Sequence, residues 1–187
     1  MTKDSRTPAP AAPGSVLWLT GPPASGKSTL ARHLVAALRE RGRVCLWLDS
    51  DDLRAVLTPA PTFDEAERDR FYAALAHLAR LGAEGGALVV LSATAPRRRY
   101  RDALRATVSR FVEVELRCDR TLLEARDPKG LYAAARRGEV TRLPGVGVAY
   151  EPPLAPELVL DTGSLDAATA VERLLAVLER ESRPATE

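Results

Sequence analysis

The stretch that decides the fold is Gly21-Pro22-Pro23-Ala24-Ser25-Gly26-Lys27-Ser28. It matches the phosphate-binding pattern G-x-x-x-x-G-K-[ST] at every fixed position. An apolar run precedes it at 16–19, and residues 27–41 carry leucines every four positions, as on one face of a helix. A strand, a glycine-containing turn and a helix in this order predict a loop whose backbone N–H groups surround phosphates at the helix N-terminus.

The fixed residues of this loop are explained by the chemistry of phosphate binding. Gly21 and Gly26 permit backbone angles that other residues avoid. Lys27 is expected to contact the β- and γ-phosphates of ATP, and the Ser28 hydroxyl to ligate Mg²⁺. The predicted ATP-binding residues here are Gly21, Pro22, Pro23, Ala24, Ser25, Gly26, Lys27, Ser28 and Thr29.

The rest of the chain alternates strands with helices. Apolar runs predict four more strands, at 44–48, 87–91, 111–116 and 158–160. Between and after them, amphipathic segments predict helices that include 64–81, which we expect to end at Gly82, and 167–178. Such alternation predicts an α/β protein with the P-loop NTPase fold, that is, a five-stranded parallel sheet with helices on both faces.

Acidic residues follow the second predicted strand, in the run Asp49-Ser50-Asp51-Asp52-Leu53-Arg54. Ligands of such sheets lie beyond the carboxyl ends of the strands, which places this run beside the phosphate-binding loop. A kinase acting on an alcohol needs a carboxylate that accepts the hydroxyl proton or holds a metal's water, and we assign this role to Asp49. Arg54 is expected to hold an anionic acceptor, Asp51 to orient either group, and Asp52 to cap a helix.

A phosphate-binding loop is shared by kinases, GTPases, motor ATPases and regulatory nucleotide binders. The chain lacks the N-K-x-D run by which GTPases read guanine. We therefore expect a small-molecule kinase domain over residues 15–180, with a Gly- and Pro-rich lid at about 127–157 that contains a short helix. Residues 1–14 are expected to form a disordered N-terminal tail and 181–187 a C-terminal tail.

The composition bears on which partners the protein binds and on where in the cell it is located. A net charge of +2 on 187 residues does not favour a nucleic-acid-coating protein. No run of about 18 apolar residues predicts a membrane span. The two cysteines, Cys45 and Cys118, are expected to be buried free thiols in a reducing compartment, so we expect a cytoplasmic protein.

Three further strings carry a more specific resemblance: Asp127-Pro128-Lys129-Gly130-Leu131-Tyr132, Tyr150-Glu151-Pro152-Pro153 and Pro156-Glu157-Leu158-Val159-Leu160-Asp161-Thr162. With the loop and the acidic run, they make residues 18–161 resemble adenylylsulfate kinases. The resemblance implies phosphorylation of the ribose 3′-hydroxyl of adenylyl sulfate by Mg·ATP, giving 3′-phosphoadenylyl sulfate. It also implies a possible homodimer.

The resemblance carries individual residues across. Asp49, Asp51 and Arg54 match the family's D-G-D-N-x-R stretch. Positions matching the family's remaining acceptor contacts are Phe63, beside the adenine, and Arg68 and Lys129, beside the anionic groups. Arg126 matches a residue that covers the base of ATP. Arg98 and Arg101 also match family positions, and are expected either to hold anionic ligands or to form a solvated face.

Departures from the family fall on the acceptor side. Phe71 replaces an asparagine, and Ala95 replaces a serine sometimes described as phosphorylated, which excludes a phosphoserine intermediate there. Leu143 stands where the family has a lid aromatic that stacks on the acceptor base, so we expect Leu143 to contact the acceptor, and Gly147 replaces an aspartate. Three hypotheses therefore stay open: an adenylylsulfate kinase, a diverged phosphotransferase acting on another small-molecule hydroxyl, and a nucleotide-binding subunit without turnover. The sequence leaves the oligomeric state, the pathway and a partner sulfurylase open.

Overall fold

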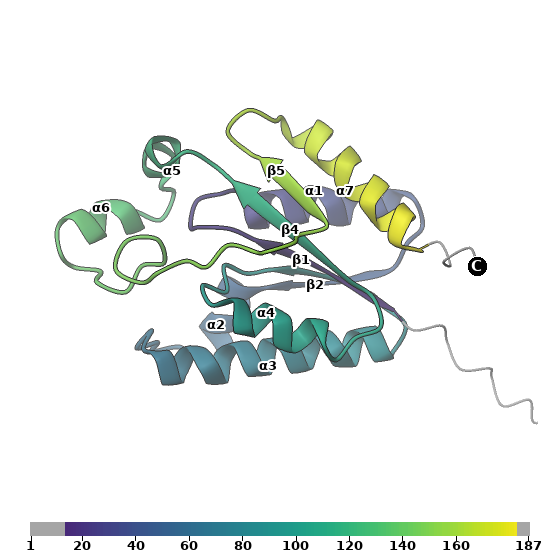
Figure 1. The fold of residues 1–187 in the computed structure, drawn as a ribbon, viewed down its shortest axis with the longest axis horizontal. Coiled ribbons are helices and arrows are strands. Elements are labelled where there is room, and N and C mark those ends of the chain that lie inside the picture. The colour runs from purple at the N-terminus through teal and green to yellow at the C-terminus, as the bar shows by residue number, and fades with distance from the viewer. Residues whose placement is uncertain (1–13, 183–187) are drawn as a thin grey trace, which may run out of the picture.

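The computed structural model describes residues 14–182, which fold around a parallel sheet of five strands (Figure 1). The strand order is β2-β3-β1-β4-β5, and every neighbouring pair is parallel. The strands are β1 (Ser15–Thr20), β2 (Cys45–Asp49), β3 (Leu88–Ser92), β4 (Phe111–Arg117) and β5 (Leu158–Asp161). The predicted fold class is confirmed.

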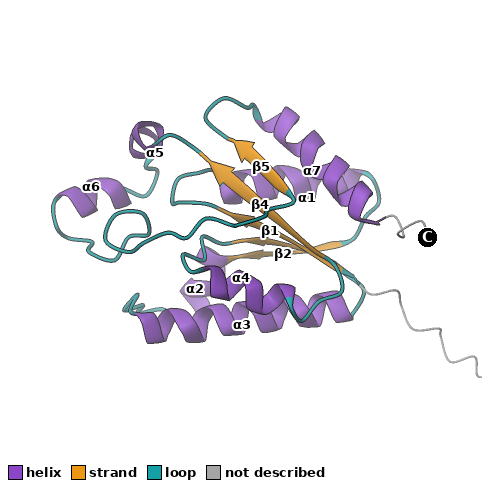
Figure 2. Ribbon diagram, viewed as in Figure 1, coloured by secondary structure: helices purple, strands orange, loops and turns teal. Residues whose placement is uncertain are grey.

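Helices cover both faces of the sheet (Figure 2). They are α1 (Lys27–Glu40), α2 (Ser50–Leu57), α3 (Glu65–Glu84), α4 (Arg98–Arg105), α5 (Arg120–Arg126), α6 (Leu131–Arg136) and α7 (Ala167–Ser182). Helices α1 and α7 pack on one face, and α3 and α4 pack on the other (Figure 1). Every helix among these residues is too short or too polar to cross a lipid bilayer.

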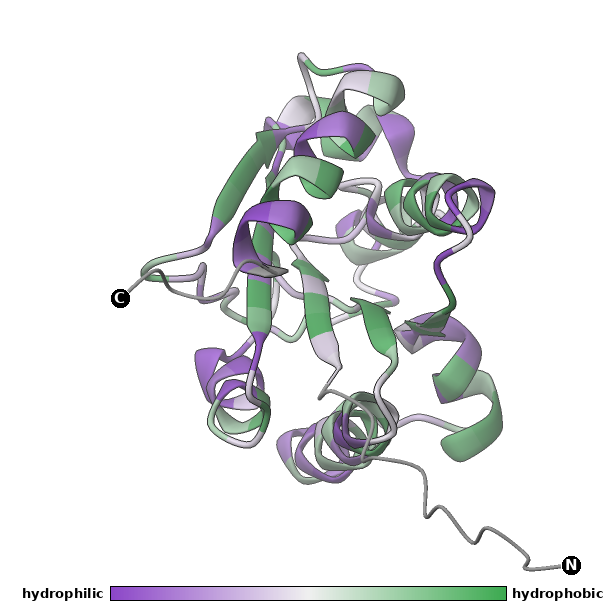
Figure 3. Cartoon of the chain, turned by 90° about the vertical axis from the view of Figure 1, so that its right-hand side faces the viewer, coloured by the Kyte–Doolittle hydropathy of each residue, from purple (hydrophilic) through white to green (hydrophobic). Residues whose placement is uncertain are grey.

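Side chains of β1 alternate between two apolar cores. Leu17 and Leu19 join α1 and α7 in one core, whereas Val16 and Trp18 join α3 and α4 in the other. All four are fully buried, which places β1 at the centre of a sheet covered on both faces. The apolar strands accordingly run between the helical layers in Figure 3. The rigid centre fixes the C-terminal end of β1, from which the phosphate-binding loop starts.

The predicted end of a helix at Gly82 is wrong, because α3 continues through this residue to Glu84. A Cβ atom on Gly82 would lie 2.8 Å from Val89 Cγ2 and 3.1 Å from Leu46 Cδ2. The missing side chain therefore serves close packing of the helix on the sheet rather than termination of the helix.

The predicted lid contains α6, as expected, and follows α5, which the sequence pattern did not suggest. Leu123, Tyr132 and Leu143 form a small apolar cluster there. The predicted tails lie largely outside the described residues. Gly14 nevertheless donates a backbone hydrogen bond to Ala83 O at 2.8 Å, and α7 extends to Ser182.

Candidate active site

The phosphate-binding loop joins β1 to α1 and is held in a tight turn by its backbone. A Cβ atom on Gly21 would lie 2.6 Å from Leu116 O, so this position has no space for a side chain. Ala24 and Gly26 have φ angles of +62° and +89°, in the left-handed region. Such a conformation is uncommon for alanine, and it helps to turn the chain before α1 begins at Lys27.

Lys27 lies over the loop that precedes it. Its Nζ donates to Gly21 O at 2.9 Å and to Pro22 O at 2.8 Å. Burial among these groups lowers the pKa of Lys27 to about 8, against the opposing influence of the negative charges of Asp51 and Asp49. The ammonium group is therefore bonded to its own loop, within the influence of the negative charges that follow β2.

Asp49 ends β2 and is only 7% exposed. Its Oδ1 accepts a hydrogen bond from Asp51 N at 2.8 Å, and its Oδ2 accepts one from the Ser92 hydroxyl at 2.7 Å. Asp49 is thus the N-cap of α2, and Asp52, for which we predicted that role, is exposed in the first turn. The strand register pairs Asp49 with Ser92 and Ser92 with Leu19, so the carboxylate lies at the same edge as the end of β1.

Arg54 lies behind this carboxylate, on α2. Its guanidinium stacks 3.8 Å from the ring centroid of Phe71 and 5.0 Å from that of Phe63. It also pairs with the buried carboxylate of Glu67, whose Oε2 accepts from Phe63 N at 3.0 Å. Glu67 thereby fixes both the predicted anion-binding arginine and the predicted base-contacting aromatic.

Arg68 and Lys129 connect the acceptor side to the lid. Arg68 Nε donates to Phe63 O at 3.0 Å, and its Nη2 donates to Arg142 O at 2.7 Å. Burial lowers the pKa of Arg68. Lys129 forms an ion pair with Asp51. These two predicted acceptor cations, like Arg54, are thus each already bonded to a protein group.

The remaining predicted residues lie in two places. Ser28 and Thr29 belong to the first turn of α1, and Arg126 donates to Thr162 O at 2.7 Å beside the phosphate-binding loop. Thr162 in turn donates from its hydroxyl to Ser25 O at 3.0 Å. Leu143 is 4% exposed inside the lid's apolar cluster, so its predicted contact with an acceptor base stays a prediction.

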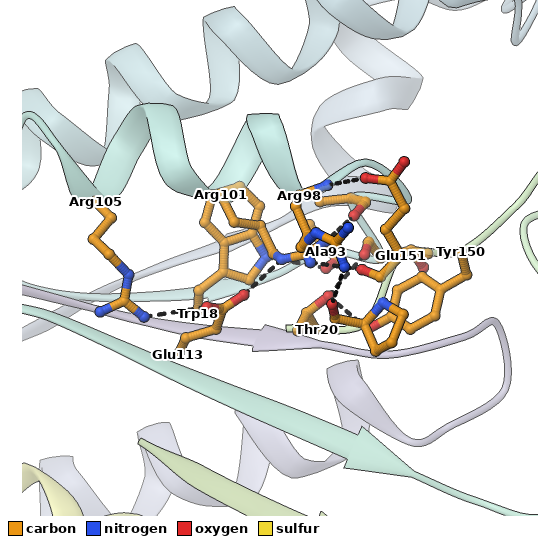
Figure 4. Close-up of polar contacts among 12 residues, drawn as sticks. Trp18, Thr20, Ala93, Arg98, Arg101, Arg105, Glu113, Tyr150 and Glu151 are labelled. Carbon is orange, nitrogen blue, oxygen red and sulfur yellow. Dashed lines mark hydrogen bonds and ion pairs between the residues drawn. The ribbon is translucent and has the colours of Figure 1, made fainter. Parts of the chain in front are cut away.

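The segment that returns from the lid is anchored to the sheet (Figure 4). Arg101 is 1% exposed; its Nε donates to Glu113 Oε1 at 2.6 Å and its Nη2 to Glu151 O at 2.7 Å. Neither expectation for Arg101 was right, because this side chain is a buried structural contact. The hydroxyl groups of Tyr150 and Thr20 lie 3.2 Å apart, and burial raises the pKa of Tyr150 to about 12.

Sequence reasoning missed the residues that hold the site together. Ser92 and Glu67 fix Asp49 and Arg54, and Thr162 supports the phosphate-binding loop. A signal existed for Ser92, since it is a polar residue that closes a buried strand as Asp49 does. Trp18 is fully buried in the core, whereas Cys45 and Cys118, which we expected to be buried, are free thiols that are only partly buried.

Comparisons with known proteins agree with this architecture. An adenylyl-sulfate kinase of Paraburkholderia xenovorans (strain LB400) is 41% identical over 169 residues, which cover 90% of this chain and 94% of that protein. An adenylyl-sulfate kinase of Geotalea uraniireducens (strain Rf4) is 37% identical, with coverages of 89% and 81%. The APS kinase of Mycobacterium tuberculosis, solved with AMPPNP and APS, has a TM-score of 0.84 at 34% identity, covering 89% of this chain and 98% of its own.

More remote structures share only the fold. A sugar kinase from Janibacter sp. HTCC2649 has a TM-score of 0.63 at 19% identity, covering 89% of this chain and 95% of its own. A sequence model described as adenylylsulphate kinase, by contrast, matches residues 13–161, which is most of the chain. The resemblance that the motifs carried is confirmed: this chain belongs to the adenylylsulphate kinase family.

Proposed function

We propose that this protein transfers the γ-phosphoryl group of ATP to the 3′-hydroxyl of adenylyl sulfate, giving ADP and 3′-phosphoadenylyl sulfate. The observation that carries the proposal is that the phosphate-binding loop of Lys27 and the fixed carboxylate of Asp49 follow strands β1 and β2 at the same edge of the sheet. The similarity to proteins named adenylyl-sulfate kinase supports this acceptor.

The donor side would act by position and charge. The backbone N–H groups of the loop and Lys27 bind the β- and γ-phosphates of ATP. The 3′-oxygen of the acceptor attacks the γ-phosphorus while the bond to the β–γ bridging oxygen breaks. Asp49 accepts the proton of the 3′-hydroxyl, because a carboxylate within hydrogen-bond reach makes the oxygen a better nucleophile.

The residues present fit Mg²⁺. The Ser28 hydroxyl and the Asp49 carboxylate supply the oxygen ligands that this ion takes, directly or through water. Residues 14–182 contain no group of three or more His, Cys, Asp or Glu side chains that could enclose a metal. Mg²⁺ in kinases is usually held by one or two protein groups and by the phosphates of the substrate. When bound, Mg²⁺ neutralises charge on the phosphate oxygens.

The acceptor side is proposed from the residues around Arg54. Arg54, Arg68 and Lys129 supply positive charge for the phosphosulfate, and the exposed ring of Phe63 offers a face to the adenine. Asp51 orients Lys129 through their ion pair. Leu143 would support acceptor binding indirectly, by packing in the apolar cluster of the lid. Arg126 would cover the base of ATP.

The test is direct. The purified protein is incubated with Mg·ATP and adenylyl sulfate, and 3′-phosphoadenylyl sulfate is measured by chromatography alongside ADP release. A parallel screen replaces adenylyl sulfate with AMP, with nucleosides and with small sugars. Product from adenylyl sulfate at a rate well above that of the other acceptors supports the proposal. ADP release with another alcohol alone would assign a diverged phosphotransferase, and nucleotide binding without any turnover would assign a binding subunit.

We also propose a homodimer and a cytoplasmic location. The family resemblance supports the first, and two free thiols, which are typical of a reducing compartment, support the second. Light scattering on the eluting protein measures the oligomeric state, and fractionation of the source cells measures the location.

A further inference from the structure

Two consecutive hydrogen bonds within the sheet lead from Trp47 through Ser92 to the carboxylate of Asp49. Trp47 Nε1 donates to Ser92 Oγ at 3.0 Å, and Ser92 Oγ donates to Asp49 Oδ2 at 2.7 Å. Trp47 and Asp49 lie on β2, and Ser92 is the last residue of the neighbouring β3. Ser92 is 1% exposed. Its hydroxyl is thus removed from solvent and bonded only to groups of the protein.

The chemistry of the donor groups determines which atom donates in each of these two hydrogen bonds. An indole nitrogen can only donate, and a serine hydroxyl has a single proton. Because the Ser92 oxygen accepts from Trp47, its own proton is directed to Asp49. A backbone donor, Asp51 N, holds the other carboxylate oxygen at 2.8 Å. The carboxylate is therefore held at both oxygens, which limits its rotation about the last side-chain bond.

We propose that Ser92 and Trp47 are positioning residues for the reaction, which hold the Asp49 carboxylate in the orientation that accepts the acceptor's proton. This inference rests on the proposed function of Asp49. Ser92 acts on Asp49, and Trp47 acts only through Ser92. Both stay outside the chemical step. Their contribution is to keep the carboxylate aligned while the phosphoryl group moves, since misalignment of a reacting group is costly.

The protein contains a matched control for the tryptophan. Its other indole, Trp18, donates to Ala93 O at 3.0 Å, which is a backbone carbonyl and not the hydroxyl that bonds Asp49. Both indoles thus make one hydrogen bond of the same length on neighbouring parts of the sheet. Only the bond of Trp47 leads to the carboxylate.

The first experiment measures steady-state kinetics with Mg·ATP and adenylyl sulfate. Ser92→Ala is expected to lower kcat about tenfold with both KM values within about twofold, as for the loss of a hydrogen bond to a charged group. Trp47→Phe is expected to lower kcat about threefold, and Trp18→Phe to leave it within about twofold. In the double variant, Trp47→Phe should have no further effect on top of Ser92→Ala, because its action passes through the hydroxyl.

Two kinetic results would overturn the proposal. One is an unchanged kcat in Ser92→Ala. The other is a Trp47→Phe effect that persists in the Ser92→Ala background. Thermal unfolding of each variant separates these results from loss of folded protein.

A second readout does not require turnover. The chain has two tryptophans, so its ¹⁵N–¹H spectrum shows two indole signals. Ser92→Ala and Asp49→Asn should move the signal of Trp47 and leave that of Trp18 in place. If the Trp47 signal does not move in Ser92→Ala, the indole of Trp47 is not bonded to Ser92 and the proposal is wrong. A wild-type protein that is inactive towards adenylyl sulfate, with a Trp47 signal that responds, would refute the proposed function alone.

Discussion

The donor and acceptor halves of the site are built in different ways. On the donor side, Lys27 bonds to backbone carbonyls of its own loop, Gly21 O and Pro22 O. On the acceptor side, cations bond to groups from other segments: Arg54 to Glu67, and Arg68 to Arg142 O. The first half is a local structure of eight residues, and the second is assembled from α2, α3 and the lid.

This difference explains where the chain departs from its family. Gly21 cannot change without disturbing the backbone of the loop, because a Cβ atom there would meet Leu116 O. The acceptor half can absorb substitutions through repacking: Phe71 supports the guanidinium of Arg54 with its ring, and Leu143 joins the lid's apolar cluster. Experiments that separate nucleotide binding from acceptor binding should therefore give different results on the two sides.

The largest effect is expected at the boundary between the halves. Asp49→Asn should lower turnover about a thousandfold, because an amide cannot accept the hydroxyl proton. The affinity for ATP, measured by calorimetry, should stay within about twofold. Asparagine is also a good N-cap, so α2 should be retained. Asp52→Asn, at an exposed position of the same helix, is the control, and equal losses in the two variants would contradict the assignment.

The donor half should respond to pH through Lys27. Its pKa of about 8 means that the free protein loses this positive charge as pH rises above 8. Bound phosphate requires the charged form, so the Kd for ATP should rise about tenfold per pH unit above 8 and be nearly constant below it. Calorimetry between pH 6.5 and 9.5 measures this. Lys27→Met should bind weakly at every pH, and a sloping profile in that variant would assign the titration to another group.

The acceptor half should respond to Glu67→Gln. Removing the charge weakens the contacts that fix Arg54 and Phe63 N, and the KM for adenylyl sulfate should rise about tenfold while that for ATP stays unchanged. Initial rates with each substrate varied in turn measure both constants. Glu65→Gln, at an exposed position near the start of the same helix, is the control. Equal increases of both KM values would show that the two halves are not separable.

The smallest effect is expected for stability at the lid contact. Lys129 and Asp51 are 54% and 61% exposed, so their ion pair contributes little, and Lys129→Ala should change Tm by less than about 2 °C. Calorimetric unfolding measures this. Arg101→Met provides the contrast, because it removes a buried partner of Glu113 and should lower Tm several times more. A large shift for Lys129→Ala would mean that the lid contact stabilises the fold.

Local patterns made much of the fold predictable. The central strands β1 and β3 are buried on both faces, so they could be recognised in the sequence as apolar runs, and the loop of Lys27 is encoded in consecutive residues. The role of Gly82 was not predictable from local pattern, because it depends on the contacts of α3 with Val89 of β3 and Leu46 of β2. Helix α5 spans only seven residues, and its one local signal is the N-cap Asp119, which accepts from Thr121 N at 2.8 Å.

The contacts that hold the acceptor side could not be predicted in this way. Arg54 and Glu67 are thirteen positions apart on different helices, and Ser92 is forty-three positions from Asp49. Arg101 was expected to meet ligand or solvent, because a buried arginine requires partners that the sequence does not place beside it. Such pairings follow from how the helices pack on the sheet, which periodicity alone does not specify.

The hydroxyl of Thr20 connects the segment that returns from the lid to the start of the phosphate-binding loop. It donates to Thr94 O at 2.8 Å and meets Tyr150 Oη, and Thr20 is the residue directly before Gly21. The return path of the lid is therefore fastened one residue upstream of the phosphate-binding turn. A displacement of residues 127–157 that pulled on Tyr150 would therefore act on the backbone at the start of that turn.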